Sequence, residues 1–237
     1  DRLILVQIRL RRALLGLSVG GSLGLAGAAL QGLMRNPLVE PGLIGVSGGA
    51  SLGAVMAFYG GAALVSPAAV PAAGFAGALV ATALLAAVAA RGVRVAVLVL
   101  FGVALGSLTG ALTALALNLA PSPFAILEIV FWLLGSIADR SRCDVVLALP
   151  RMAVGWTLLL TAGRGMEALT LGETAAGSLG IDMRRFTFRV ILGTALAVGP
   201  AVAVAGTISF VGLVVPHIVR PWVGHRPGAV LGASALG

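Results

Sequence analysis

Long apolar runs separated by short polar turns dominate the chain. Six of these runs approach the roughly 20 residues that a helix needs to cross a bilayer; they cover residues 13–34, 43–59, 68–90, 95–120, 145–162 and 186–205. Glycine, proline and charged residues gather in the breaks, such as RNPLVEPG, RGVR and APSP. The pattern predicts an all-α, polytopic transmembrane helix bundle that forms a single domain over residues 1–237, without a separate soluble domain.

Two further apolar stretches differ from the six runs. Residues 208–223 are interrupted by two prolines, which predicts a broken or re-entrant helix. Residues 124–137 predict a short amphipathic segment between two spans. Phe131 and Trp132 within it are of the type that gathers at membrane interfaces, so we expect them there.

The composition fits a chain whose solvent is lipid. Hydrophobic residues make up 59% of the 237 positions and charged residues 10%, whereas a soluble domain carries about 25% charged residues. All sixteen basic residues are arginine. A phosphate-binding P-loop requires a lysine, so the chain is predicted to bind no ATP or other cofactor itself. The arginines are scattered between apolar runs rather than gathered on one face, which argues against nucleic acid as a partner.

Charge alone does not orient the predicted bundle. If each run crosses once and residues 208–223 return to their own side, seven arginines lie on one side and eight on the other. The seven are Arg35, Arg91, Arg94, Arg164, Arg184, Arg185 and Arg189, and the eight are Arg2, Arg9, Arg11, Arg12, Arg140, Arg142, Arg220 and Arg226. The positive-inside rule needs an asymmetry. The balance therefore predicts that some outer arginines serve a purpose other than topology.

Glycines recur at a spacing of four residues inside three of the runs. A spacing of four places residues along one helix face, where glycine lets a neighbouring backbone approach closely. The three triplets are Gly16, Gly20 and Gly24; Gly45, Gly49 and Gly53; and Gly102, Gly106 and Gly110. Close helix packing is predicted at each of them.

Three stretches together resemble one protein family. They are RLRRALLGLSVGGSLGLAGAALQGLMRNPLVEPGLIGVSGGASLGA from residue 9, LTLGETAAGSLGID at 169–182, and AGTISFVGLVVPHIVRPWVG at 205–224. Their order and sequence resemble the FecCD-like permeases of ABC importers for iron-siderophore, haem and cobalamin. The resemblance implies a type II importer permease of the bacterial plasma (inner) membrane, of which this sequence would be a fragment lacking the first and last spans.

The same resemblance implies partners. These are a second copy in a homodimer, membrane lipid, an extracytoplasmic substrate-binding protein, and separate cytoplasmic subunits that bind ATP and Mg. The chain would then be a transporter subunit and not an enzyme.

The stretch 169–182 resembles the cytoplasmic coupling loop of that family. Gly172 and Gly180 bracket a short helical stretch, and the carboxylate of Glu173 complements the start of that helix. Leu171 and Leu179 could fill an apolar groove of an ATPase. The residues assigned to coupling are Leu171, Gly172, Glu173, Ala175, Ala176, Leu179 and Gly180.

The resemblance also assigns docking and gating positions. Arg9 and Arg12 match the arginines that receive acidic residues of the binding protein, with Arg11 in place of the usual proline. The alternative is that this basic flank anchors a helix to lipid phosphates. The residues assigned to the gate and pathway are Asn36, Pro37, Leu38, Val95, Ala96, Ser47, Gly49 and Gly106.

Two other functions compete with the importer. The GVSGG pattern around Ser47 could mark an intramembrane serine hydrolase, with His217 or His225 as its base. An ion-coupled carrier would need carboxylates within its spans, and Glu128 is the acidic residue inside a largely apolar stretch. Arg151 interrupts another apolar run, and we expect it to face a cavity, a partner or the outer interface.

Overall fold

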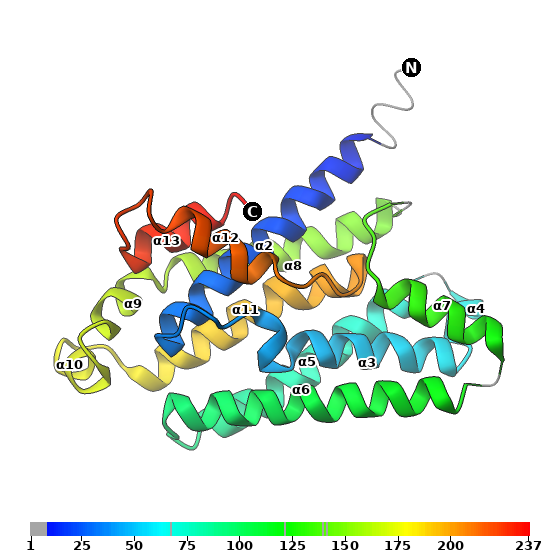
Figure 1. Ribbon diagram of the computed structural model, residues 1–237, viewed down its shortest axis with the longest axis horizontal. Coiled ribbons are helices and arrows are strands. Elements are labelled where there is room, and N and C mark those ends of the chain that lie inside the picture. The colour runs from blue at the N-terminus through cyan, green and yellow to red at the C-terminus, as the bar shows by residue number, and fades with distance from the viewer. Residues whose placement is uncertain (1–8, 67, 121, 139, 141) are drawn as a thin grey trace.

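The computed structural model describes residues 9–66, 68–120, 122–138, 140 and 142–237, which form an all-helical bundle without a strand (Figure 1). Five segments of it are long and apolar enough to cross a membrane. They are α2 (Leu10–Met34), α5 (Ala69–Ala89), α6 (Val95–Asn118), the stretch Asp144–Leu169 that joins α8 (Arg142–Leu160) to α9 (Gly163–Leu169), and α11 (Met183–Ala205). The predicted polytopic helix bundle is confirmed.

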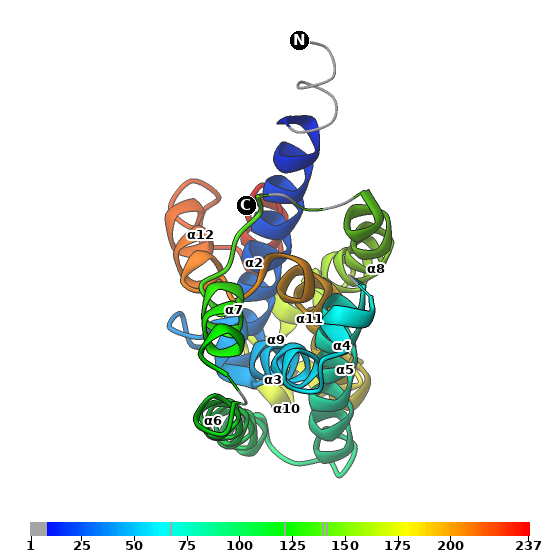
Figure 2. The same cartoon turned by 90° about the vertical axis from the view of Figure 1, so that its right-hand side faces the viewer.

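Shorter helices complete the bundle. They are η2 (Pro41–Ile44), α3 (Val46–Tyr59), α4 (Ala62–Val65), α7 (Pro123–Leu133), α10 (Glu173–Ser178), α12 (Val211–Val219) and α13 (Pro227–Ser234). The core lies around α2 and α11, whose spans are 72% and 78% buried, whereas α6 lies at the edge with 22% buried (Figure 2). The apolar face of α6 therefore lies against lipid or another protein in the membrane.

Glycine contacts bring the backbones of neighbouring helices together. A Cβ atom on Gly77 of α5 would lie 2.1 Å from the carbonyl oxygen of Gly49 of α3, and one on Gly24 of α2 would lie 2.4 Å from that of Ser234. Close packing is thus confirmed for the second triplet, whereas in the first only Gly24 lies this close to another backbone. The third triplet also fits only in part, because Gly110 has no neighbouring atom within 4 Å of such a Cβ.

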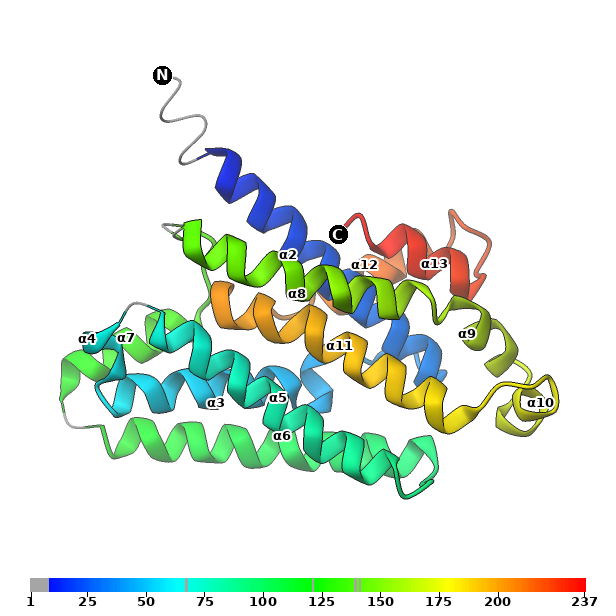
Figure 3. The same cartoon turned by 180° about the vertical axis from the view of Figure 1, so that it is seen from behind.

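The bundle has two ends, which are named here by the helices that lie there. The α10 end comprises α10, the last turn of α2, the turn between α5 and α6, and the first turn of α11. The α7 end comprises α7, the last turn of α6 and the first turn of α2 (Figures 1 and 3). Because α2 has 25 residues, its own two ends lie about 37 Å apart.

The segment predicted to be re-entrant instead crosses from one end to the other. At the α7 end, the amide of Ser136 donates to the carbonyl of Ala205 at 2.7 Å, and the hydroxyl of Thr207 donates to the carbonyl of Leu133. At the α10 end, Nη2 of Arg220 donates to Oε1 of Gln31 at 2.6 Å. The nine residues of α12 rise about 14 Å, and five irregular residues before it can add about 16 Å, which together match a bilayer core.

This crossing corrects the arginine count. Arg220 and Arg226 lie at the α10 end, so the balance changes from seven and eight to nine at the α10 end and six on the other side, of which Arg2 lies outside the described residues. The prediction that arginines are evenly divided between the two sides was wrong. It counted as crossings only the apolar runs that are long enough to span the membrane as one helix. By the positive-inside rule, this asymmetry favours the α10 end as the cytoplasmic one.

Helix α7 is amphipathic as predicted, with Phe131 exposed and Ile129 buried. Trp132, however, is only 7% exposed and belongs to the core. A Cβ on Gly206 would lie 2.3 Å from its carbonyl oxygen, so the loop after α11 passes directly over it. The expectation of an interfacial tryptophan was therefore wrong, because tertiary contact with that loop covers the residue.

Candidate functional site

The short helix α10 is built as a stub held between two glycines. Gly172 precedes it with φ +105° and Gly180 follows it with φ +85°, a backbone conformation that favours glycine. The amide of Ile181 donates to the carbonyl of Ala176 at 3.1 Å, and that of Gly180 donates to Gly177 at 3.0 Å. This pair of bonds is the Schellman arrangement that ends a helix. The predicted short helix bracketed by glycines is confirmed.

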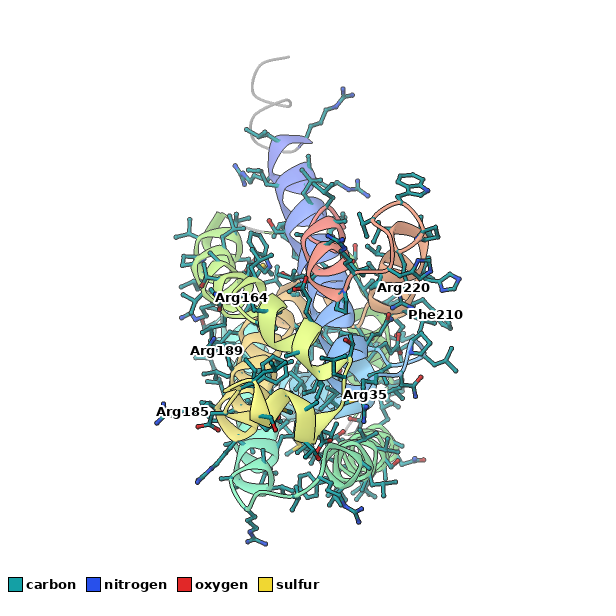
Figure 4. The ribbon with its side chains drawn as sticks, turned by 90° about the vertical axis from the view of Figure 1, so that its left-hand side faces the viewer. Arg35, Arg164, Arg185, Arg189, Phe210 and Arg220 are labelled. Atoms are coloured by element: carbon teal, nitrogen blue, oxygen red, sulfur yellow. The ribbon has the colours of Figure 1, made fainter. Side chains whose placement is uncertain are left out.

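The stub has an inner and an outer face. Ala176 is fully buried, while Leu171 and Leu179 on either side of the stub are 69% and 62% exposed. A small residue inside and two large apolar residues outside leave a surface that no described residue covers. Figure 4 views this end of the molecule directly. Such a surface is suited to a partner protein.

The turn after α2 is fixed by its own hydrogen bonds. Arg35 adopts a left-handed conformation with φ +47° and ends the helix. The amide of Asn36 donates to the carbonyl of Gln31 at 3.2 Å, and Oδ1 of Asn36 accepts from the amide of Leu38 at 3.0 Å. The side chain of Leu38 projects outward as a result.

A cleft of about 660 Å³ joins the predicted gate to the predicted coupling segment. Asn36, Val95 and Ala96 line it together with Glu173, so three segments far apart in sequence converge. Arg35 and Arg94 line the same cleft and make its rim basic. Pro37 lines a neighbouring cleft with Arg220 and His225 instead, so the gate residues do not all face one space.

The remaining predicted pathway residues lie in helix contacts. Gly49 packs on Gly77 as described above, and a Cβ on Gly106 would lie 3.7 Å from the Cα of Gly45. Ser47, in the first turn of α3, is half-buried, and its carbonyl accepts from the hydroxyl of Ser51 at 2.9 Å. This geometry is that of helix packing.

The serine hydrolase alternative finds no catalytic pair. Ser47 lies in α3, whereas His217 lies in α12 and His225 lines a cleft at the α10 end. Among the described residues, no hydrogen bond joins Ser47 to either imidazole. A nucleophilic serine requires such a base within reach.

The ion-coupled carrier alternative requires carboxylates inside the spans, and the described residues do not place them there. Glu128 is exposed on α7, which is too short to span. In the five candidate spans, the carboxylates are those of Asp144 and Glu167, and both stand near the ends of one span. A relay of carboxylates through the membrane interior is therefore not formed by the described residues.

Arg9 and Arg12 lie at the opposite end of α2 from Arg35. Both are exposed, and they are three residues apart along the helix, so they share one face. Arg11 lies within the first turn of α2. The two arginines predicted to dock a binding protein thus lie about 37 Å of helix away from the cleft that holds Glu173.

Arg151 contacts a neighbouring helix rather than an open cavity. Its guanidinium lies 5.0 Å from the ring centroid of Phe75 of α5, and its Nη1 donates to the carbonyl of Leu147. A cation over an aromatic face is stabilised by the ring quadrupole. The expectation that it faces a cavity, a partner or the outer interface did not include this packing role.

Sequence reasoning missed the roles of two polar residues on either side of the turn after α2, Gln31 and Glu40. Gln31 is buried; its Nε2 donates to the carbonyl of Val39 at 3.3 Å, and its Oε1 accepts from Arg220 at 2.6 Å. Oε2 of Glu40 accepts from the amide of Phe210 at 3.1 Å, where α12 begins. The position of Gln31 inside an apolar run was the sequence feature that could have indicated a buried polar contact. Together these bonds tie α12 to the turn after α2.

Replacing Gln31 with leucine is expected to lower the free energy of unfolding by about 1–3 kcal/mol, because Arg220 and the carbonyl of Val39 lose a partner in a poorly solvated place. Thermal unfolding of the detergent-purified protein measures this. Arg220→Leu in the Gln31→Leu background should cost less than it does alone. Equal costs in both backgrounds would show that the two side chains are not coupled.

The arrangement defines a class of protein. The other spans surround the buried helices α2 and α11, and the exposed stub α10 lies beside the turn after α2 and the start of α6. This is the fold of a type II ABC importer permease, a multi-pass membrane protein. The chain belongs to the FecCD transport family, whose profile matches residues 1–237. The resemblance inferred from the sequence is confirmed.

Relatives with assigned names are similar over nearly the whole chain. The vitamin B12 import system permease protein BtuC of Vibrio cholerae is 42% identical over 97% of the chain and 69% of its own length. The cobalamin import system permease protein BtuC of Halobacterium salinarum is 42% identical over 99% of the chain and 63% of its own length. The ABC transporter permease protein YvrB of Bacillus subtilis is 39% identical over 98% and 67%.

A solved structure shares the fold. It shows an inward-facing conformation of a metal-chelate type ABC transporter and superposes with a TM-score of 0.92 at 31% identity, over 99% of this chain and 75% of that one. The chain spans about two thirds of the length of the relatives named above.

Proposed function

We propose that this chain is the membrane-spanning permease subunit of an ATP-driven importer in the bacterial inner membrane. Separate subunits would bind ATP and Mg and dock on α10. A substrate-binding protein would deliver the cargo at the α7 end, where Arg9 and Arg12 lie. The permease itself would move its cargo without breaking a bond.

One observation carries this proposal: Glu173 of the stub lines the same cleft as Asn36, Val95 and Ala96. A displacement of the stub by an ATPase would therefore act directly on the turn after α2 and on the first turn of α6. Coupling of two sites requires an element that both can bias. The stub supplies one, because the exposed Leu171 and Leu179 that flank it face away from the bundle and its buried Ala176 faces inward.

The proposed cargo is a cobalamin-type or other metal chelate. Two relatives are named for vitamin B12 or cobalamin import and the matching structure for a metal chelate, and iron-siderophore and haem complexes are cargoes of the same chemical kind. A path for such a large molecule would lie between two copies of the chain. The exposed apolar face of α6 supports a homodimer.

The test is ATP hydrolysis by the purified permease reconstituted with its ATP-binding subunit. A cobalamin-loaded binding protein is expected to stimulate hydrolysis. Replacing Arg9 and Arg12 with glutamate should raise the binding-protein concentration needed for half-maximal stimulation by more than about tenfold, because two attractive charges become repulsive.

The matched control replaces Arg91 and Arg226 with glutamate, which changes the same charge at the α10 end. Its half-maximal concentration of binding protein should stay near the wild-type value. Equal responses in the two double variants would remove Arg9 and Arg12 from the docking surface. Absence of stimulation in the wild-type complex would contradict the importer itself.

A further inference from the structure

Four exposed arginines gather on one flank of the α10 end. Arg164 lies in the first turn of α9, and Arg184, Arg185 and Arg189 lie in the first turns of α11. Figure 4 shows Arg164, Arg185 and Arg189 on the same side of this end. One carboxylate accompanies them: Oδ2 of Asp182 lies 3.1 Å from Nε of Arg185. Among the described residues, the other three arginines form no ion pair. The flank therefore carries an excess of positive charge.

The carboxylate of Glu167 forms no ion pair with these arginines among the described residues. Glu167 of α9 is directed toward α13, where a Cβ on Gly228 would lie 2.8 Å from its Oε1. Arg35 and Arg220 lie on the other flank of the same end (Figure 4). The four arginines thus form a separate basic cluster, which we name the α11 cluster.

Two clefts border the α11 cluster. The first, of about 490 Å³, lies between α9 and the start of α11, and Arg164, Arg185 and Arg189 line it with Phe186. The second, of about 690 Å³, lies between the end of α5 and α11. Its walls include arginines of the cluster and the apolar residues Ala86, Ala89, Ala90, Leu158, Phe188 and Leu192. Arg185 and Arg189 face both clefts.

The outer face of α11 changes from basic to apolar along its length. Arg184, Phe188 and Leu192 follow one another at a spacing of four, so they lie along one helix face. The rise from Arg184 to Leu192 is about 12 Å. Phe188 is exposed, as is Leu160 on neighbouring α8. Charge at the membrane surface followed by apolar surface is the order of a phospholipid headgroup and its acyl chains.

We propose that the α11 cluster binds the headgroup phosphate of an anionic phospholipid, whose acyl chains lie along the exposed faces of α5, α8 and α11. Guanidinium groups pair phosphate oxygens bidentately, and basic pockets between spans on the cytoplasmic side suit anionic headgroups. A lipid fits better than a docked ATPase because the second cleft has apolar walls, among them Phe188. Leu171 and Leu179, the exposed leucines that flank α10, do not line it.

The experiment titrates the detergent-purified protein with dioleoyl-phosphatidylglycerol or dioleoyl-phosphatidylcholine and measures the lipid-bound fraction by native mass spectrometry. The wild type is expected to bind phosphatidylglycerol more tightly than phosphatidylcholine. In R185Q/R189Q the preference should fall by about fivefold for each arginine removed. Circular dichroism verifies that both proteins keep their helices. This is expected because Arg185 and Arg189 are exposed.

The matched control is R91Q/R226Q, which removes two charges at the same end outside both clefts. It should keep the wild-type preference, and an equal loss there would overturn the site in favour of diffuse attraction. Equal binding of the two lipids by the wild type would also overturn it. So would displacement of phosphatidylglycerol by millimolar glycerol phosphate, since the ligand would then be a soluble phosphate ester.

A final arm measures capture of the ATP-binding subunit by the same variants. Loss of capture in R185Q/R189Q with phosphatidylglycerol binding unchanged would assign the cluster to that subunit and overturn the lipid site. Retained capture with lost lipid preference supports the lipid site. This arm does not depend on transport, so a failure of the importer proposal would remain distinguishable from a failure of the lipid site.

Discussion

Replacement of Leu171 and Leu179 by aspartate is expected to abolish the stimulation of ATP hydrolysis by the loaded binding protein. Both side chains flank the stub and are mostly exposed, so the change should leave the fold intact. Burying a leucine at an interface contributes about 1.5–3 kcal/mol, and burying an unpaired carboxylate adds a further cost. Affinity for the ATP-binding subunit should therefore fall by more than about 100-fold, which a pull-down and a hydrolysis assay both measure.

The control for this prediction is Leu119→Asp. Leu119 is 60% exposed, close to the values for the two stub leucines, but it follows α6 at the α7 end. Its variant should bind the ATP-binding subunit like the wild type. If the stub variant also bound normally, α10 would not be the docking element, and the convergence of Glu173 with Asn36 would need another explanation.

The helical spans could be predicted from sequence because hydrophobic runs of about 20 residues have few other stable solutions in lipid. The crossing by residues 206–220 could not, because a nine-residue helix preceded by irregular backbone leaves no run of that length. Its two ends are fixed by Thr207 with Leu133 and by Arg220 with Gln31, which are 74 and 189 residues apart in sequence. Contacts so distant carry no local signal.

The residues of the candidate site could be predicted from the sequence, but their arrangement in space could not. The glycines around α10 indicated a short bracketed helix, since glycine tolerates positive φ at both of its ends. That Glu173 would share a cleft with Asn36 and Ala96 depends on how three spans pack, which no local pattern records. The resemblance to a family assigned the coupling and gating roles to these residues. Their position around one cleft follows only from the folded structure.

Substitution of Gly27 by alanine is expected to produce the largest loss of stability among single methyl additions in the buried part of α2. The new Cβ would lie 1.8 Å from the carbonyl oxygen of Gly212 and 2.8 Å from its Cα, so the α12 backbone would have to move. Backbone shifts of this kind cost about 1–3 kcal/mol and sometimes more. Moving α12 would also strain the bonds from Arg220 to Gln31 and from Phe210 to Glu40.

Gly110→Ala provides the matched comparison, because a Cβ there meets no atom within 4 Å and alanine favours a helix interior by about 1 kcal/mol over glycine. Thermal unfolding in detergent should show a lower Tm for Gly27→Ala and an unchanged or higher Tm for Gly110→Ala. Equal Tm values would mean that α12 can shift freely against α2. In that case the crossing segment would be a mobile element rather than a fixed part of the bundle, and the tie between α12 and the turn after α2 would not hold the α10 end in shape.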